Sequence, residues 1–507
     1  MSELTLDTLI DDGNYLGTER ARLENKVLLD ELERKKKARS LAVPTDDNRV
    51  KARLREIGEP ITLFGERAAD RRDRLIYVLS QINAARGDDA MQVDEESTSE
   101  ESEDEVEEFY TPGSLELLEA RRRLAEYSLP RAQKRVAQQR IDSKIPLGRI
   151  IDIRKKIFAE VKRFAELGSQ IGDERPISQV RFSPDSKILA TGSWSGNVKL
   201  WNVPNCTPIR TLRGHNDRVG GVAWHPQATL TQSADAVNLV SGAGDMTVNL
   251  WSLNSETPLA VMKGHADRIC RVAFHPCGNY VASASFDTSW RLWDVATAKE
   301  LLLQEGHSKE VYSVEFQEDG ALAASGGLDA IGRVWDLRTG RTAMVLDGHV
   351  EPIYSIAFSP NGYQIATGSG DNTIRIWDMR SLKALYTIPA HLSNVADVRF
   401  FHGQDLPYAP LANPPDDPMD STDTEEAKDR AKADMEERTY RAGLYMVSAG
   451  YDGLVKLWSA DDWQLLRTLP TDGGKVMSVD LSNDGKYLAS GTFNRNFQMF
   501  APDETLN

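Results

Sequence analysis

Residues 264 to 294 read GHADRICRVAFHPCGNYVASASFDTSWRLWD, and this stretch decides the fold. Gly264-His265 opens it, two short apolar segments follow, Asp287 marks a turn, and Trp293-Asp294 closes it. Apolar segments of this length, bounded by Gly, Asn and Asp, predict the strands of one small antiparallel sheet. Because such a sheet cannot bury both of its faces alone, the stretch predicts a unit that stacks on copies of itself.

The same unit recurs along the chain, and its tryptophans give the period. Four of them lie 42 residues apart: Trp251, Trp293, Trp335 and Trp377. Trp201 precedes this series by 50 residues, Trp458 follows it by 81, and Phe500 stands 42 after Trp458, so one register with insertions of 8 and 39 residues gives seven units.

This pattern resembles the WD-repeat family over roughly residues 165 to 501. The resemblance implies an all-β, seven-bladed WD-repeat β-propeller, which we expect to follow an α-helical, partly disordered N-terminal region. In that family the segment before the first blade closes the ring as the outer strand of the last blade. Here that segment is about Phe164 to Asp173.

Three residue types recur within the units at constant spacing. In three units an Asp lies 22 residues after the His and a Trp lies 6 further on: His265, Asp287, Trp293; His307, Asp329, Trp335; His349, Asp371, Trp377. One such copy could suggest catalysis, but repetition around a ring indicates a buried hydrogen-bond network. Units one and seven have Ser195 and Asn494 at the Asp position and lack the His, so their networks are expected to be incomplete. We expect no catalytic residue, no metal and no cofactor, because nucleotide-binding and metal-binding motifs are absent from the sequence.

The residue before each turn position should lie on one rim of the ring, where loops carry the variable chemistry. Large rings at this position are Trp194, Phe286, Tyr451 and Phe493, and three of them come from the neighbouring blades six, seven and one. Cations expected on the same rim are Arg218, Arg268 and Lys309. We predict that this rim binds partners, with packing of each ring against its own blade as the alternative.

Charge is unevenly distributed along the 507 residues. The formal net charge is −16, but residues 88 to 108 alone hold twelve Asp or Glu and no Lys or Arg. Local basic patches are therefore compatible with the acidic total. Three cysteines suggest a reducing compartment, and we expect a soluble intracellular protein with no membrane association. Residues 34 to 39, RKKKAR, are either a nuclear address or the solvated end of a helix.

The N-terminal third lacks the repeat and carries a different motif. Residues 44 to 75, PTDDNRVKARLREIGEPITLFGERAADRRDRL, resemble the splicing-factor motif of the pre-mRNA-processing factor 4 family of U4/U6 small nuclear ribonucleoprotein subunits, which is distinct from the similarly named kinase. Residues 110 to 135 and 169 to 184 resemble the same family. The spacing of Val50, Leu54 and Ile57 predicts one apolar helix face in a small helical hairpin.

A hairpin this small should dock on RNA or on a partner protein, with a self-contained capping domain as the alternative. The residues we expect to make these contacts are Arg49, Lys51, Arg53, Arg55, Leu63, Phe64, Arg71, Arg72 and Arg74. A second basic segment precedes the propeller and contains Arg154, Lys155, Lys156 and Lys162. Beside these cations an apolar stripe that includes Ile157, Val161 and Phe164 predicts a helix that packs on the propeller, and RNA contact by its basic side is compatible with that packing.

These features divide the chain into six parts. We expect a helical N-terminal segment (1–43), a splicing-factor-motif helical hairpin (44–86), an acidic disordered linker (87–108), a basic helical linker (109–163), the propeller (164–501, with an insertion at 403–442) and a tail (502–507).

The resemblance implies a non-enzymatic scaffold subunit of the spliceosomal U4/U6 and U4/U6.U5 tri-snRNP particles, acting in the nucleus in particle assembly and pre-mRNA splicing. The partners that it implies are U4 and U6 small nuclear RNA, a pre-mRNA-processing factor 3 type subunit, a spliceosomal cyclophilin, a pre-mRNA-processing factor 31 type subunit and other tri-snRNP proteins. The main alternative is a WD-repeat substrate receptor of a ubiquitin ligase or chromatin complex. A propeller hydrolase is a third, which the structural explanation of the repeated His and Asp disfavours.

Overall fold

The computed structural model describes residues 47–61, 71–72, 74–79, 114–142, 147–403, 444–472 and 474–503. The chain forms two compact units, residues 1–106 and 107–507. The predicted contact residues Leu63 and Phe64, the side chain of Arg49, the acidic tract at 88–108 and nearly all of the 403–442 insertion lie outside the described residues.

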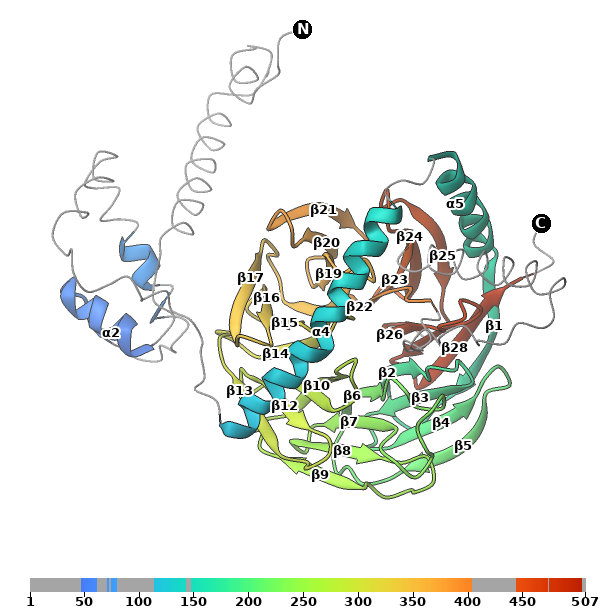
Figure 1. Ribbon diagram of the computed structural model, residues 1–507, viewed down its shortest axis with the longest axis horizontal. Coiled ribbons are helices and arrows are strands. Elements are labelled where there is room, and N and C mark those ends of the chain that lie inside the picture. The colour runs from blue at the N-terminus through green and yellow to red at the C-terminus, as the bar shows by residue number, and fades with distance from the viewer. Residues whose placement is uncertain are drawn as a thin grey trace, which may run out of the picture. The chain divides into compact units, whose positions relative to one another are not determined.

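The larger unit contains a ring of seven four-stranded antiparallel sheets, which confirms the predicted seven-bladed propeller (Figure 1). The first three blades, each from its inner to its outer strand, are β2 Ile177–Phe182, β3 Ile188–Ser193, β4 Val198–Asn202 and β5 Thr207–Leu212; β6 Val219–Trp224, β7 Leu239–Ala243, β8 Thr247–Trp251 and β9 Ala260–Lys263; β10 Ile269–Phe274, β11 Tyr280–Ser285, β12 Trp290–Asp294 and β13 Glu300–Gln304.

Blades four to six repeat this order. Their strands are β14 Val311–Phe316, β15 Leu322–Gly327, β16 Ile331–Asp336 and β17 Arg341–Asp347; β18 Ile353–Phe358, β19 Gln364–Ser369, β20 Thr373–Asp378 and β21 Lys383–Pro389; β22 Val395–Phe400, β23 Tyr445–Gly450, β24 Leu454–Ser459 and β25 Leu465–Pro470. The long insertion interrupts blade six between β22 and β23.

The seventh blade joins the two ends of the propeller. Its strands are β26 Val476–Leu481, β27 Leu488–Thr492, β28 Asn496–Pro502 and, as the outer strand, β1 Phe164–Ile171. Phe164 pairs with Pro502 and Ile171 with Asn496 in an antiparallel register. This confirms the predicted closure of the ring by the segment before the first blade.

Each blade is held by apolar residues that its strands turn toward the neighbouring blade. The inner and second strands are almost wholly buried, as in β10 and β11, whereas outer strands such as β21 are mostly exposed. Trp251, Trp293 and Trp335 are at most 1% exposed. Stacking in a ring therefore buries the sheet faces that a single sheet would expose to water. This burial stabilises the fold by about 25 cal/mol per Å² of apolar surface.

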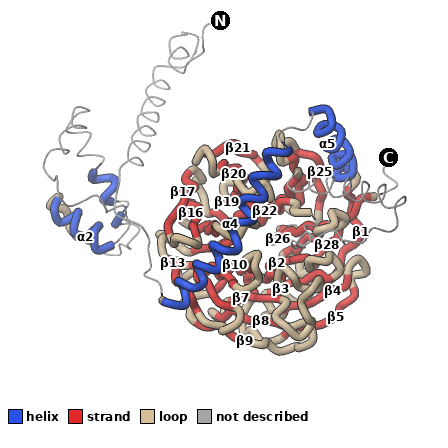
Figure 2. Tube along the Cα trace, in the orientation of Figure 1, coloured by secondary structure: helices blue, strands red, loops and turns tan. Residues whose placement is uncertain are grey.

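In the described part of the larger unit, two helices precede the ring. Helix α4, Leu115–Asp142, crosses one face of the propeller, and α5, Leu147–Lys162, leads directly into β1 (Figure 2). Ile157 and Val161 of α5 and Phe164 of β1 are buried in one cluster with residues of blades six and seven. The predicted apolar stripe therefore does pack on the propeller.

The smaller unit contains α2, Asp47–Glu56, and a helical segment at residues 74–79. Val50, Leu54 and Leu75 are buried together, with Ile57 packed against them. Gly58, at a φ of 82°, follows α2 in the left-handed conformation that glycine adopts at helix ends. The predicted apolar face of α2 is therefore buried against the helical segment at residues 74–79.

Candidate partner-binding surface

Five blades contain the same chain of side-chain hydrogen bonds. In blade four, His307 Nδ1 lies 3.0 Å from Asp329 Oδ2, His307 Nε2 lies 2.7 Å from Ser325 Oγ, and Trp335 Nε1 donates to that oxygen at 2.8 Å. The equivalent sets in the other four blades are His215, Asp245, Ser241, Trp251; His265, Asp287, Ser283, Trp293; His349, Asp371, Thr367, Trp377; and His391, Asp452, Ser448, Trp458.

These networks cross-link the strands of each blade, and their His and Asp side chains are already bonded within the blade. Both ring nitrogens of each His bind a group within the blade, so neither is directed at a ligand. Burial would raise the pKa of Asp329, but hydrogen bonds from His307 and from backbone N–H groups outweigh it and lower the value. The sequence analysis identified the His, Asp and Trp but missed the hydroxyl at the centre, which stands ten residues before the Trp in every case.

Blade one contains a variant of this network. Gly172-Asp173 stands where blades two to five have Gly-His, and Ser195 stands at the turn position, so the carboxylate comes from the start of the unit and its hydroxyl partner from the turn. Ser195 Oγ donates to Asp173, and Lys199 Nζ lies 3.2 Å from the same carboxylate. Burial would raise the pKa of Asp173, but the hydrogen bonds from Ser195 and from the Glu174 N–H lower it.

Blade seven has lost the network. Phe500 replaces the Trp, and among the described residues no group bonds to the buried hydroxyl of Ser490, the equivalent of the central Ser or Thr. Asn494, at the turn position, is exposed. The two blades that depart from the pattern are neighbours in the ring, because β2 of blade one packs against β26 and β27 of blade seven.

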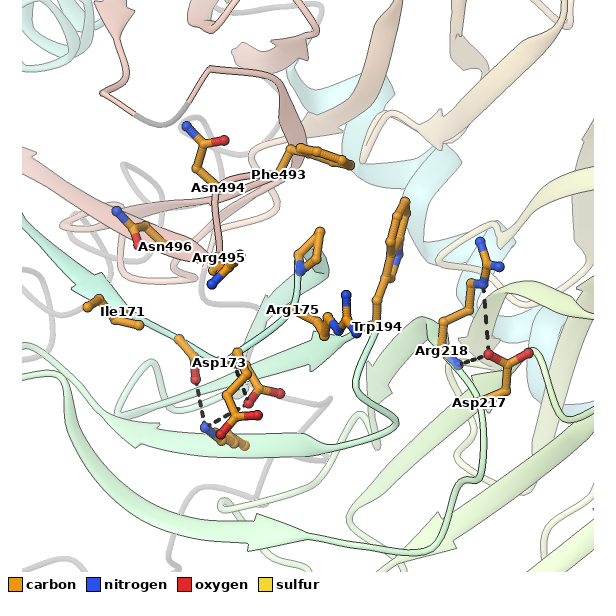
Figure 3. A pocket seen from close by; sticks show the side chains of 14 residues that line it. Ile171, Asp173, Arg175, Trp194, Asp217, Arg218, Phe493, Asn494, Arg495 and Asn496 are labelled. Atoms are coloured by element: carbon orange, nitrogen blue, oxygen red, sulfur yellow. Dashed lines mark hydrogen bonds and ion pairs between the residues drawn. The ribbon is translucent and has the colours of Figure 1, made fainter.

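A cleft opens where these two blades meet (Figure 3). We call it the junction cleft; it has a volume of about 1140 Å³, and its principal lining residues are Asp173, Arg175, Trp194, Arg218, Phe493 and Arg495. The rings of Trp194 and Phe493 meet edge to face with centroids 5.6 Å apart, and the Arg218 guanidinium lies 5.3 Å from the Trp194 ring centre. Phe493 is 42% exposed, so this aromatic pair is accessible from the rim.

The structure separates the other predicted rim residues from this pair. Lys475 Nζ lies 5.4 Å from the centre of the Tyr451 ring. Burial raises the pKa of Tyr451 far above the ordinary tyrosine value. Arg268 lies 3.8 Å over the ring of Phe286 in blade three, and Lys309 is exposed in the loop before blade four. The predicted arc of three rings is thus a pair at the junction cleft together with a more buried tyrosine.

Charged side chains between the inner strands form a network that the sequence analysis did not predict. Arg181 Nη1 lies 3.2 Å from Asp397 Oδ2, and Arg399 Nη1 lies 2.8 Å from Glu315 Oε2. Ser478 donates to Asp397 at 2.7 Å. Burial opposes ionisation of Asp397, but the guanidinium groups of Arg181 and Arg399 lower its pKa to about 2. The network links blades one, four, six and seven across the centre of the ring.

Helix α4 covers the opposite face. Arg135 Nε lies 2.7 Å from Asp319 Oδ2, and Gln139 Nε2 donates to the Asn361 carbonyl at 2.7 Å. Asp319 and Asn361 follow the inner strands of blades four and five, whereas Trp194 and Phe493 precede third strands, so antiparallel pairing places the two sets at opposite ends of the blades. The face bearing the junction cleft is therefore not the face that α4 covers.

The predicted basic residues near α5 differ in their surroundings. Arg154 Nε lies 2.6 Å from Asp461, which joins α5 to blade six. Lys155, Lys156 and Lys162 are exposed. The exposed lysines, and not Arg154, are free of the propeller in this helix.

In the hairpin, several predicted basic residues are engaged within the unit. Arg53 pairs with Glu56 at 2.8 Å, Arg74 donates to the Pro60 carbonyl at 2.8 Å, and Arg71 is buried. Lys51 and Arg72 are half-buried, and Arg55 is exposed.

The described part of the chain holds neither a metal-binding cluster nor a membrane-spanning helix. No group of three or more His, Cys, Asp or Glu side chains is placed there to hold a metal ion. No helix described is both long and apolar enough to cross a bilayer.

Comparison with protein families matches both parts of the chain. The family described as pre-mRNA processing factor 4 (PRP4) like matches residues 50–78. The WD domain, G-beta repeat, matches six segments, at residues 165–202, 206–252, 256–294, 299–336, 340–378 and 463–500. The unmatched interval between the last two contains the first three strands of blade six and its long insertion.

Similar proteins carry names that agree with this combination. Proteins named U4/U6 small nuclear ribonucleoprotein Prp4 from Mus musculus and Homo sapiens are each 44% identical over 207 residues, covering 40% of this chain and 39% of the relative. The U4/U6 small nuclear ribonucleoprotein PRP4-like protein of Arabidopsis thaliana is 38% identical over 226 residues, covering 43% of this chain and 41% of the relative. The matched region thus spans about two fifths of the length of these relatives.

Proposed function

Because the chain joins a pre-mRNA processing factor 4-like segment to a WD-repeat β-propeller, we propose that it is a non-enzymatic scaffold subunit of the U4/U6 and U4/U6.U5 tri-snRNP particles. In this role it supports particle assembly and pre-mRNA splicing in the nucleus. The observation that carries the proposal is the presence of both parts in one chain, since a propeller alone names no pathway.

The physical properties of the two parts support a binding role. The strands of the propeller are committed to packing and its His and Asp side chains to internal hydrogen bonds, so the loops are left for partners. Among the described residues, the hairpin buries Val50, Leu54 and Leu75 together. Binding of the hairpin to a particle would add to the stability of this small apolar cluster.

We propose U4 and U6 small nuclear RNA as partners, together with a pre-mRNA-processing factor 3 type subunit, a spliceosomal cyclophilin and a pre-mRNA-processing factor 31 type subunit. Arg55 in the hairpin and Lys155, Lys156 and Lys162 in α5 are the exposed cations that could meet RNA phosphate or acidic protein surfaces. The nuclear location follows from the same proposal.

The test is recovery of RNA with the full-length tagged protein from nuclear extract. We expect U4 and U6 RNA to be enriched with the complete chain and to be lost after deletion of residues 44–75. Deletion of the 403–442 insertion, which leaves both motif and blades in place, is the matched control and should retain the RNA. Absence of both RNAs from the wild-type purification would reject the proposal.

A second candidate is favoured by the accessible aromatic pair of the junction cleft. A WD-repeat substrate receptor of a ubiquitin ligase or chromatin complex would use such a pair to hold a peptide. The same deletion separates the two functions. Unchanged association of the 44–75 deletion with its partners, together with loss of partners from a Trp194→Ala variant, would favour the receptor.

A further inference from the structure

We propose that the junction cleft binds an acidic peptide segment of a partner protein, with an apolar side chain of that segment anchored on the Trp194–Phe493 pair. The inference deepens the proposed scaffold role and rests on it for its biological setting. Its physical basis is the cleft itself, which three independent features support.

The first feature is the position of the cleft in the repeat pattern. Five blades fill the space beside the turn with a His ring bonded to an Asp. Blades one and seven lack that His, and they are neighbours, so the missing rings fall on the two sides of one junction. The cleft opens there, which indicates that departures from the repeat have created a recess.

The second feature is a preorganised apolar anchor. Trp194 is held by Phe493 at one edge and by the Arg218 guanidinium over its ring. Neither ring belongs to a core cluster of the propeller, and Phe493 is 42% exposed. A fixed, accessible aromatic pair loses little conformational entropy on binding, which is the property of an interface anchor.

The third feature is a surplus of positive charge. Two of the three lining carboxylates are occupied, because Asp173 accepts bonds from Ser195 and Lys199 and Asp217 faces Arg218. Arg175 and Arg495 are exposed in the cleft, and no side chain within the described ranges forms an ion pair with either. Figure 3 shows both on the side of Trp194 away from Arg218.

The distribution of charge beyond the cleft favours a peptide over RNA. A nucleic-acid strand needs a basic track along its backbone. Outside the cleft, the rim cations Arg268 and Lys309 each stand beside an acid, in the pairs Asp267-Arg268 and Lys309-Glu310. Within the cleft the cations outnumber the acids by one, with Arg175, Lys199, Arg218 and Arg495 against Asp173, Glu174 and Asp217. This local surplus matches a short acidic segment with one apolar anchor.

The experiment uses the purified full-length protein and a fluorescent synthetic peptide with a central Phe-Leu pair flanked by Glu and Asp. We expect binding that weakens as salt is raised, and an affinity at least about tenfold lower for Trp194→Ala and for the double variant Arg175→Glu with Arg495→Glu. Arg268→Glu is the matched control, because Arg268 also follows an Asp and covers an aromatic ring but lies outside the cleft. Its affinity should stay within about twofold of wild type.

Several results would overturn the inference. Two of them concern charge: equal binding of a peptide whose acids are replaced by Lys, and equal weakening of binding by Arg268→Glu. The other two concern the ligand: no binding of the acidic peptide to the wild-type protein, and binding of oligouridylate at the cleft in place of the acidic peptide. The charge-reversal variant changes exposed side chains only, so it remains informative should Trp194→Ala lower the melting temperature. U4 and U6 RNA recovery without peptide binding rejects this inference alone, whereas peptide binding without RNA recovery rejects the scaffold proposal.

Discussion

The hydroxyl at the centre of each His, Asp and Trp network provides the sharpest test of a structural role for these residues. Ser325 in blade four accepts a bond from Trp335 Nε1 at 2.8 Å and lies 2.7 Å from His307 Nε2. Replacing it by Ala removes one oxygen and creates almost no cavity. The substitution therefore isolates the hydrogen bonds from the packing.

The expected cost follows from the two groups left behind. The Trp335 indole N–H and His307 Nε2 would both lose the Ser325 oxygen while remaining buried, since Trp335 is 1% and His307 8% exposed. At about 1–3 kcal/mol for each unsatisfied group, and allowing for partial relaxation, the loss is about 3 kcal/mol. An unfolding entropy of about 2.1 cal/mol/K per residue over roughly 300 residues converts this into a fall of about 5 °C in melting temperature.

The assay is differential scanning calorimetry of the wild type, Ser325→Ala and Ser308→Ala. Ser308 lies in the same blade and is exposed, and only its backbone N–H bonds to Asp329, so its substitution should leave the melting temperature unchanged. A Ser325→Ala protein that melts together with the Ser308→Ala control would refute the assignment of the network to stability.

Three further predictions follow from contacts described above. Arg135→Ala should leave the Asp319 side chain, 8% exposed, without its ion pair and weaken the docking of α4 on the propeller by about 2 kcal/mol. Hydrogen exchange in α4 should then be faster, whereas Arg122→Ala, at an exposed position of the same helix, should leave the exchange rate unchanged. The pKa of Asp397 is about 2 when the protein is folded and about 3.9 when it is unfolded, so the stability that its ionised form contributes is present above about pH 4 and lost between about pH 4 and 2. The melting temperature of the wild type should therefore fall over that range more steeply than that of Asp397→Asn. Leu54→Ala should cost the hairpin about 2–5 kcal/mol of stability and lower the recovery of U4 and U6 RNA. The melting temperature of the propeller should not change, and an unaltered RNA yield would contradict the prediction.

The ring was predictable from the sequence because its determinants are local and repeated. Most units carry a Gly-His, their strands and a Trp at fixed intervals, so one blade predicts the others. The central Ser or Thr was within reach of the same reasoning, since it always stands ten residues before the Trp. A single Ser or Thr does not indicate the network, because small hydroxyl residues are common throughout these strands.

The features that depend on ring closure were not predictable. Arg181 and Asp397 are 216 positions apart in the chain, and only the circular arrangement brings them to 3.2 Å. The separation of Tyr451 from the Trp194–Phe493 pair was not predictable either, because the direction of each aromatic side chain depends on neighbouring loops such as the loop that contains Lys475. The covering of one face by α4 is a third example, since its anchors Asp319 and Asn361 lie in two different blades.

The pairing of β1 with β28 also has a consequence for synthesis of the protein. β1 leaves the ribosome first among the strands, and its partner follows more than three hundred residues later. At about 5–20 residues per second, β1 must wait on the order of 20–70 s with its backbone groups unpaired. Its sequence suits such a delay, because only Phe164 is buried and most other positions from Ala165 to Ile171 are exposed in the finished ring. Because the finished ring buries only Phe164 among the side chains of β1, this delay leaves one large side chain of the strand waiting for its final packing partners while the remaining blades are made.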